Sequence, residues 1–93
     1  MFGPKRIACP AGQWTTIIRT SFAQMPKAWS VRLSSAGGAP VRGAFVESKS
    51  AWVFPTTPQQ GTIDGAHTFE RGYWNTFYAV RVNPEVDATA EVD

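Results

Sequence analysis

Strict alternation of apolar and polar residues is the clearest pattern in this sequence. In "KAWSVRLS", residues 27–34, the apolar side chains of Trp29, Val31 and Leu33 are separated by small or polar ones. A period of two over this length is typical of a strand with one face in a core and the other in water. We therefore predict a strand over these residues, with Trp29 in the core.

Other short segments share this character, because they are rich in β-branched and aromatic residues and are separated by Gly and Pro. The further predicted strands are residues 4–9, 13–20, 41–48, 51–54, 67–71 and 73–82. In the second of these, alternation places Trp14, Thr16 and Ile18 on one face. No window shows an uninterrupted helical period. The pattern therefore predicts an all-β fold of about six or seven short strands, either a single jelly-roll-like β-sandwich or a barrel.

Glycines and prolines mark two further features. Residues 55–66, "PTTPQQGTIDGA", contain two prolines, two glycines and little apolar content, so we interpret them as the longest loop. Loops of about 12 residues without regular structure are uncommon and tend to be functional or mobile. Gly43, inside a predicted strand, indicates a bulge or a close approach of two backbones.

The last strand is apolar on both faces. Alternation places one set of side chains toward the core, and this set comprises Trp74, Tyr78, Val80 and Val82. The opposite set comprises Tyr73, Phe77 and Arg81, beside Asn75 and Ala79. Exposed rings of this kind usually mark an interaction site, so we predict that Tyr73, Phe77 and Arg81 contact a neighbouring subunit. The alternative is that residues 55–66, or the N-terminal segment with Phe2, cover this face within one chain.

The net charge of +2 is unevenly distributed over the 93 residues. Residues 85–93 contain four acidic residues and no Lys or Arg, which leaves nine basic residues against three acidic ones in the rest of the chain. We predict one β-sandwich domain over residues 1–84 and a flexible acidic tail over residues 85–93. The basic body suggests an anionic partner, either nucleic acid or an acidic protein surface. An ordinary solvated surface is the alternative.

Four Trp, six Phe and two Tyr are a large aromatic supply for one small core. We expect each Trp to be a core ring, as the alternation around Trp29 indicates. The alternative is recognition of a carbohydrate or nucleic acid by stacking on exposed rings, with arginines holding phosphate. The candidate stacking residues are Trp52, Tyr73 and Trp74, and the candidate arginines are Arg19, Arg32, Arg42, Arg71 and Arg81.

The residues argue against enzyme chemistry, and we predict no catalytic residue, no metal site and no cofactor. His67 is the only histidine, and no serine lies in a G-x-S-x-G elbow. Cys9, Asp64, His67 and Glu70 lack the paired spacing of zinc ligands. We interpret His67 as a ring that shields a sheet edge.

Cys9 is the only cysteine, so no disulfide can form within the chain. No secretory signal follows the basic pair near the start, and no stretch reaches the roughly 18 apolar residues of a membrane span. These features predict a chain that is made in a reducing cytoplasm, is not secreted by a signal peptide and does not enter a membrane.

The segment "CPAGQWTTI", residues 9–17, resembles the first hairpin of many short bacteriophage virion proteins. The all-β pattern and the length are also similar to those of capsid decoration and head-fibre-type proteins. The resemblance implies a non-enzymatic structural protein of the virion that binds and cements coat or other particle subunits. It also implies homo-oligomers, which are commonly trimers in such proteins. No functional residue can be carried over from it.

Overall fold

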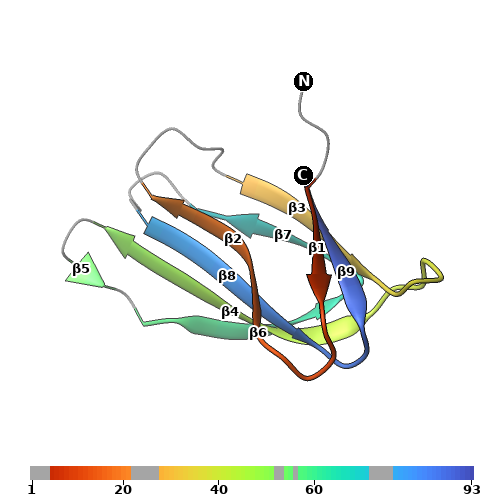
Figure 1. The fold of residues 1–93 in the computed structure, drawn as a ribbon. Coiled ribbons are helices and arrows are strands. Elements are labelled where there is room, and N and C mark those ends of the chain that lie inside the picture. Colours follow the sequence, from red (N-terminus) through yellow and green to blue (C-terminus); the bar gives the residue numbers. More distant parts are fainter. Residues whose placement is uncertain (1–4, 22–27, 52–53, 56, 72–76) are drawn as a thin grey trace.

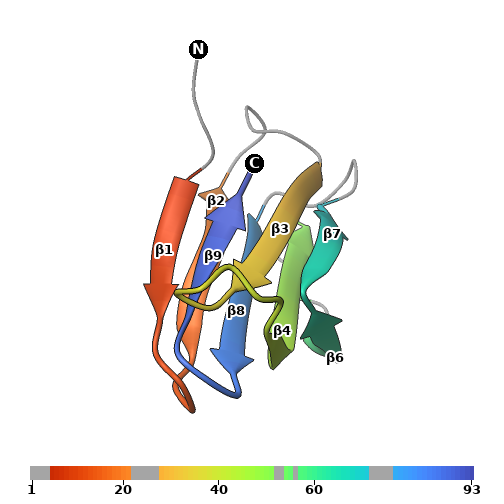
Figure 2. The same cartoon turned by 90° about the vertical axis from the view of Figure 1, so that its right-hand side faces the viewer.

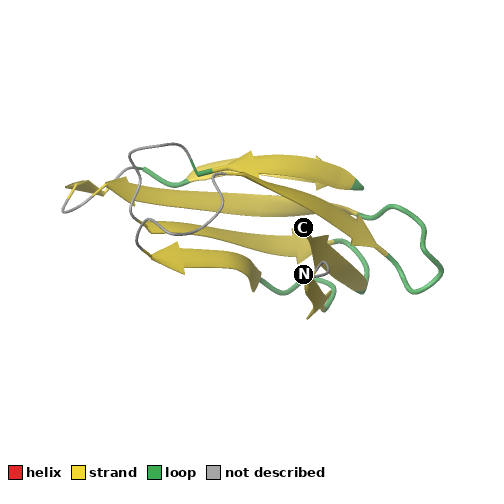
Figure 3. Ribbon diagram, turned by 90° about the horizontal axis from the view of Figure 1, so that it is seen from above, coloured by secondary structure: helices red, strands yellow, loops and turns green. Residues whose placement is uncertain are grey.

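The computed structural model describes residues 5–21, 28–51, 54–55, 57–71 and 77–93 (Figure 1). These residues form strands and connecting loops, as the view from above shows (Figure 3). The predicted all-β class is confirmed. The strands of the described residues are β1 (Lys5–Cys9), β2 (Thr15–Ser21), β3 (Ala28–Ser34), β4 (Arg42–Ala51), β5 (Phe54–Pro55), β6 (Gln59–Asp64), β7 (Ala66–Glu70), β8 (Phe77–Pro84) and β9 (Ala88–Val92).

The strands form a two-layer sandwich that is folded from one continuous antiparallel ladder. The order is β1-β9-β3-β7-β6-β4-β8-β2, with β5 paired to β4. The first four strands form one layer and the last four the other, so that β1, β9 and β3 lie in front of β2, β8 and β4 (Figure 2). The ladder turns between the layers at Gly65, where Asp64 pairs with Ala66. Gly65 has a φ of 81°, which a residue with a Cβ rarely adopts.

The core lies between the layers and is built by strands with period-two burial. Val31 and Leu33 on β3 face Tyr78, Val80 and Val82 on β8, and all five belong to one buried cluster. The predicted inner set of the last strand is therefore confirmed for its described members, while Trp74 lies outside the described residues. Trp29 is half-buried and packs against the same cluster, as its alternation indicates.

The prediction of a flexible acidic tail over residues 85–93 is wrong. β9 lies inside a sheet, between β1 and β3, with Val92 in register with both Lys5 and Val31. Ala88, Ala90 and Val92 are buried in the core. The sequence of β9 alternates apolar residues with outward-facing Thr89 and Glu91, as a half-buried strand does. The prediction of a tail relied on the number of acidic residues and overlooked this alternation.

The prediction of a long loop over residues 55–66 is also wrong. β6 pairs with β4 along its whole length, and Ile63 is buried in the core. Gly61 looked like a loop residue, yet it faces the ring of Phe45 across the ladder. A Cβ on Gly61 would lie 2.5 Å from that ring, so the glycine makes room for Phe45.

A β-bulge changes the predicted faces of residues 13–20. Thr16 pairs with Arg81 and Ile18 with Val80, which leaves Ile17 as the extra residue of β2. Ile17 and Ile18 are consecutive, and both are 4% exposed within the core cluster. The prediction that Trp14, Thr16 and Ile18 share one face is therefore wrong.

Two smaller expectations concern individual connections. Gly43 does mark a close backbone approach, because a Cβ there would lie 2.8 Å from the carbonyl oxygen of Asn83. Residues 10–12 form the expected turn but close no hairpin, since β1 pairs with β9 and β2 with β8. The turn passes from one layer to the other. The strand predicted over residues 51–54 lies partly outside the described residues.

Candidate functional site

The two outer faces of the sandwich differ in chemistry. On the β1-β9-β3-β7 layer, the outward residues are mostly small, hydroxyl-bearing or charged, among them Ser30, Arg32, Thr68 and Glu91. Arg6 pairs with Glu91 across the sheet at 3.4 Å, and both side chains remain in contact with solvent. Exposed pairs of this kind contribute little to stability. This face has the character of an ordinary solvated surface.

The outer face of the β6-β4-β8-β2 layer carries rings and arginines instead. We call it the aromatic–arginine face and define it by Trp14, Arg19, Phe77 and Arg81. Trp14 is 47% exposed and Phe77 is 43% exposed, which makes them two of the large exposed apolar side chains among the described residues. Phe77 lies four residues from Arg81 along β8, roughly 13 Å at the usual strand rise.

The backbone shortly before Trp14 is held by the turn that precedes β2. The amide of Ala11 donates to the Asp87 carboxylate at 2.8 Å, and the amide of Gly12 donates to the Pro84 carbonyl at 2.9 Å. These bonds tie the turn to the β8–β9 connection. The Arg81 guanidinium lies 5.7 Å from the centroid of the Trp14 ring, within the range of a cation–π contact. Trp14 and Arg81 therefore form one exposed unit.

Val46 shows that this face is partly apolar beneath its exposed side chains. Val46 lies between Arg81 and Gln60 in the ladder and points outward, yet it is only 8% exposed. It does not belong to the core cluster between the layers. Although Val46 points outward, neighbouring side chains on this face cover it and keep it from solvent.

The arginines of this face have no acidic neighbour in the ladder among the described residues. Arg81 lies beside Thr16 and Val46, and Arg19 lies beside Ala79. Further along the same outer face, Asp64 of β6 forms an ion pair with Arg42 of β4 at 3.4 Å. The described part of the face is thus cationic as well as aromatic.

Two of the three predicted interface residues lie on this face. Phe77 and Arg81 are exposed on the same side of β8, as alternation indicated, and Tyr73 lies outside the described residues. The alternative stacking residues Trp52, Tyr73 and Trp74 lie outside them as well. The sequence interpretation missed Trp14, which it assigned to the core, and it did not select Arg19 for the interface. The β-bulge at Ile17 puts Trp14 on the outer face, and strict alternation along the chain gave no signal of that bulge.

An interior polar cluster lies near one end of the sandwich. The Tyr78 ring stacks on Trp29 with a centroid distance of 5.3 Å and an interplanar angle of 4°. The Tyr78 hydroxyl donates to the Glu47 carboxylate. Burial, and then the hydrogen bond and charge of Glu47, raise the pKa of Tyr78 far above its ordinary value. A tyrosine held protonated in this way serves packing and hydrogen bonding.

His67 and Cys9 lie apart from one another and from that cluster. The His67 ring contacts Phe45 and Phe69 at centroid distances of 5.0 and 4.5 Å, close to the turn between the layers. That its ring shields a sheet edge stays a prediction. Cys9 is buried, and burial raises the pKa of its thiol. Over the described ranges, no group of three or more His, Cys, Asp or Glu is placed to hold a metal ion.

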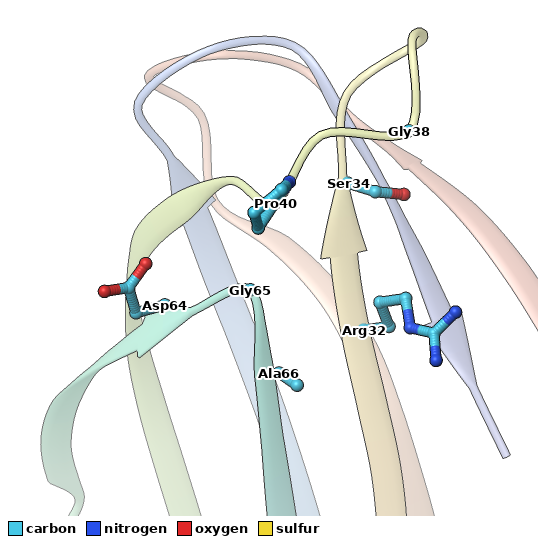
Figure 4. A pocket seen from close by; sticks show the side chains of 7 residues that line it. All are labelled: Arg32, Ser34, Gly38, Pro40, Asp64, Gly65 and Ala66. Carbon is cyan, nitrogen blue, oxygen red and sulfur yellow. The ribbon is translucent and has the colours of Figure 1, made fainter.

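A surface hollow of about 420 Å³ lies where the 35–40 turn meets the β6–β7 corner (Figure 4). Its lining consists of Arg32, Ser34, Gly38, Pro40, Asp64, Gly65 and Ala66. The guanidinium of Arg32 and the carboxylate of Asp64 point to opposite sides (Figure 4). Ligand sites usually have convergent polar groups, so this hollow lacks the arrangement of one.

In the part of the chain that the structure describes, no helix has the length and apolar character needed to cross a membrane. Comparisons of the chain with protein-family models, with curated proteins and with solved structures found no match.

Proposed function

We propose that this chain is a non-enzymatic structural component of a virion, which binds and cements particle subunits through its aromatic–arginine face. The observation that carries the proposal is the gathering of Trp14, Phe77, Arg19 and Arg81 on one sheet face, while the opposite face is solvated. Trp, aromatic rings in general and Arg are the residues enriched at the centres of protein interfaces.

The rigidity of the face supports a cementing role over a catalytic one. The backbone before Trp14 is fixed by the hydrogen-bonded turn at Ala11 and Gly12, and Phe77 and Arg81 are on a strand whose other side is in the core. A preorganised flat surface loses little side-chain entropy when a partner covers it. Such a surface suits a permanent contact between subunits.

The assignment to a virion comes from the resemblance of residues 9–17 to small bacteriophage virion proteins. With it we propose self-association of the chain and contact with a coat or other particle protein. Sedimentation of the purified chain, and of the source lysate with the chain followed by antibody, tests this. We expect the chain in a large regular particle. A monomer that never enters a particle contradicts the proposal.

A second candidate function is binding of a carbohydrate or nucleic acid. The exposed ring of Trp14 beside Arg81 favours it, because stacking rings next to arginines are used to hold nucleic acid. Late elution of a monomer from a glycan or DNA column, together with its absence from particles, would support this second function against the first.

A further inference from the structure

Arg19 and Arg81 lie close together on the aromatic–arginine face. Arg19 pairs with Ala79 and Arg81 lies two residues further along β8, so the two arginines are diagonal neighbours on adjacent strands. Diagonal neighbours are about 7–8 Å apart at Cα. The side chains of both are exposed, and neither forms an ion pair with a described residue.

Several of the described carboxylates already have partners. Glu47 pairs with Val80 in the ladder and turns inward to accept the hydrogen bond of Tyr78. Asp64 is engaged by Arg42, and Glu91 by Arg6 on the opposite face. Two neighbouring positive charges without a described counter-charge are electrostatically unfavourable until an anion lies between them.

The surroundings of the two arginines suit a planar, bidentate anion. The Arg81 guanidinium lies 5.7 Å from the centroid of the Trp14 ring, and a guanidinium can donate two parallel hydrogen bonds to one carboxylate. The side chains between the arginines are small, with Ala79 and Thr16 in the ladder and Val46 beneath. A carboxylate can therefore approach the guanidinium edges without displacing a bulky group.

The charges of Arg19 and Arg81 also argue against some binding partners of this face. Two copies joined face to face about a twofold axis would bring four arginines together, which costs free energy. Nucleic acid is held through several phosphates along its backbone. The described part of this face offers only Arg19 and Arg81 free of a described carboxylate, and no lysine faces outward there. A locally acidic protein surface needs no more than these two contacts and the two rings.

We infer that the aromatic–arginine face docks on an acidic surface of a different protein, whose carboxylates bind Arg19 and Arg81 while its apolar groups cover Trp14 and Phe77. This inference rests on the proposed cementing function and names the chemistry of the partner. Self-association of the chain then uses another surface.

The test measures binding of a fluorescent oligoglutamate and a fluorescent oligothymidylate by anisotropy, at low and at high salt. The variant pair R19Q/R81Q is compared with the control pair R6Q/R32Q, which removes the same charge from the opposite face. We expect the parent to bind oligoglutamate more tightly than oligothymidylate, and R19Q/R81Q to weaken oligoglutamate binding about tenfold or more. We expect R6Q/R32Q to weaken it less than about threefold.

Equal losses in both pairs would show a response to net charge alone and would overturn the inference. Tighter binding of oligothymidylate, lost with Arg19 and Arg81, would assign the face to nucleic acid and overturn it too. So would failure of the parent to bind oligoglutamate. If R19Q/R81Q still enters the particle as the parent does, the inference fails while the proposed function stands. If the parent never enters a particle, the proposed function fails whatever the peptide result.

Discussion

At the scale of single residues, the buried side chain of Tyr78 makes several different contacts. Its ring stacks on Trp29, its hydroxyl donates to Glu47, and the Lys49 ammonium lies 6.0 Å from its ring centroid. Burial and Glu47 raise the pKa of Tyr78 above its ordinary value of 10.0, so the hydroxyl stays protonated and remains a donor beyond the pH at which an exposed tyrosine ionises. The bond to Glu47 links β8 to β4 across the inner side of their ladder.

We expect Tyr78→Phe to lower the free energy of unfolding by about 1.5–3 kcal/mol, because the Glu47 carboxylate loses its donor. Urea unfolding at neutral pH measures this. Glu47→Gln serves as the control, since its amide oxygen still accepts from Tyr78, and its loss should be smaller. Unchanged stability of Tyr78→Phe would show that water replaces the bond at no cost.

The same tyrosine makes stability depend on alkaline pH. Because the folded pKa is raised above the unfolded value of about 10, its contribution is complete below pH 10 and is lost as the pH rises further. The unfolded state releases the proton first, with a slope of up to about 1.4 kcal/mol per pH unit. We expect the alkaline loss of stability to be steeper in the parent than in Tyr78→Phe. Equal slopes would contradict this.

At position 61, one neighbouring ring leaves no room for a side chain. We expect Gly61→Ala to cost about 1–3 kcal/mol, because the new methyl group would overlap the Phe45 ring. Gly37→Ala is the matched control, since a Cβ there meets nothing within 4 Å. Thermal unfolding of both variants measures the difference. Addition of Phe45→Leu should recover part of the loss in Gly61→Ala, and equal effects at the two glycines would contradict the explanation.

At the scale of elements, β9 is the strand that joins β1 to the rest of its layer. It pairs with β1 on one side and β3 on the other, and a backbone bond in each direction joins Asp93 to Ser30. Its inward residues are small, which lets the layers approach each other beside Cys9 and Leu33. Without β9, β1 would have no partner strand among the described residues.

Two substitutions can show whether residues 88–92 form a packed strand or a loose acidic tail. Ala90→Asp and Thr89→Asp add the same charge one residue apart, but Ala90 is 0% exposed and Thr89 faces outward. We expect Ala90→Asp to cost more than about 3 kcal/mol, since it buries an unpaired carboxylate, and Thr89→Asp to cost little. Chemical unfolding measures both. Similar small losses would mean that residues 88–92 are not packed as described.

At the scale of the whole molecule, the two layers give the protein two unlike surfaces. The principal extents of 41 × 32 × 16 Å describe a thin slab, so each layer has one side in the core and one in contact with the surroundings. The ladder closes the slab at the β6–β7 corner and leaves β1 and β2 as its last strands. The exposed rings of Trp14 and Phe77 lie on one surface with Arg19 and Arg81, and the other surface carries mixed charges and hydroxyl groups.

We expect Trp14→Ser combined with Phe77→Ser to stay folded and to lose association with the particle. The matched control is Val86→Ser, which removes an exposed apolar side chain, 52% exposed, from the β8–β9 connection. Sedimentation velocity measures association, and urea unfolding checks that each variant is folded. Equal loss of association in Val86→Ser, or unfolding of the double variant, would contradict an interface at this face.

Much of the fold could be predicted from the local sequence pattern, and so could the outward orientation of two exposed residues. The alternation in β3 and β8 predicted Val31, Leu33, Tyr78, Val80 and Val82 as inner residues, and it placed Phe77 and Arg81 on the outer side. Period two is a property of the extended backbone itself, so it needs no knowledge of the neighbours. The all-β class follows for the same reason, from many such segments between Gly and Pro.

Only tertiary structure decided the pairing partners and the position of the bulge. By itself Gly61 is compatible with a loop, and only the Phe45 ring opposite it shows why a glycine is needed in a strand. The acidic residues near the end of the chain are likewise compatible with a tail, and only the pairing of β9 with β1 and β3 shows that they belong to a strand. The bulge at Ile17 reverses the faces before it, which moves Trp14 from the expected core to the surface beside Arg81. Each of these depends on long-range register between strands, and register is set by how the whole set of side chains packs between two sheets.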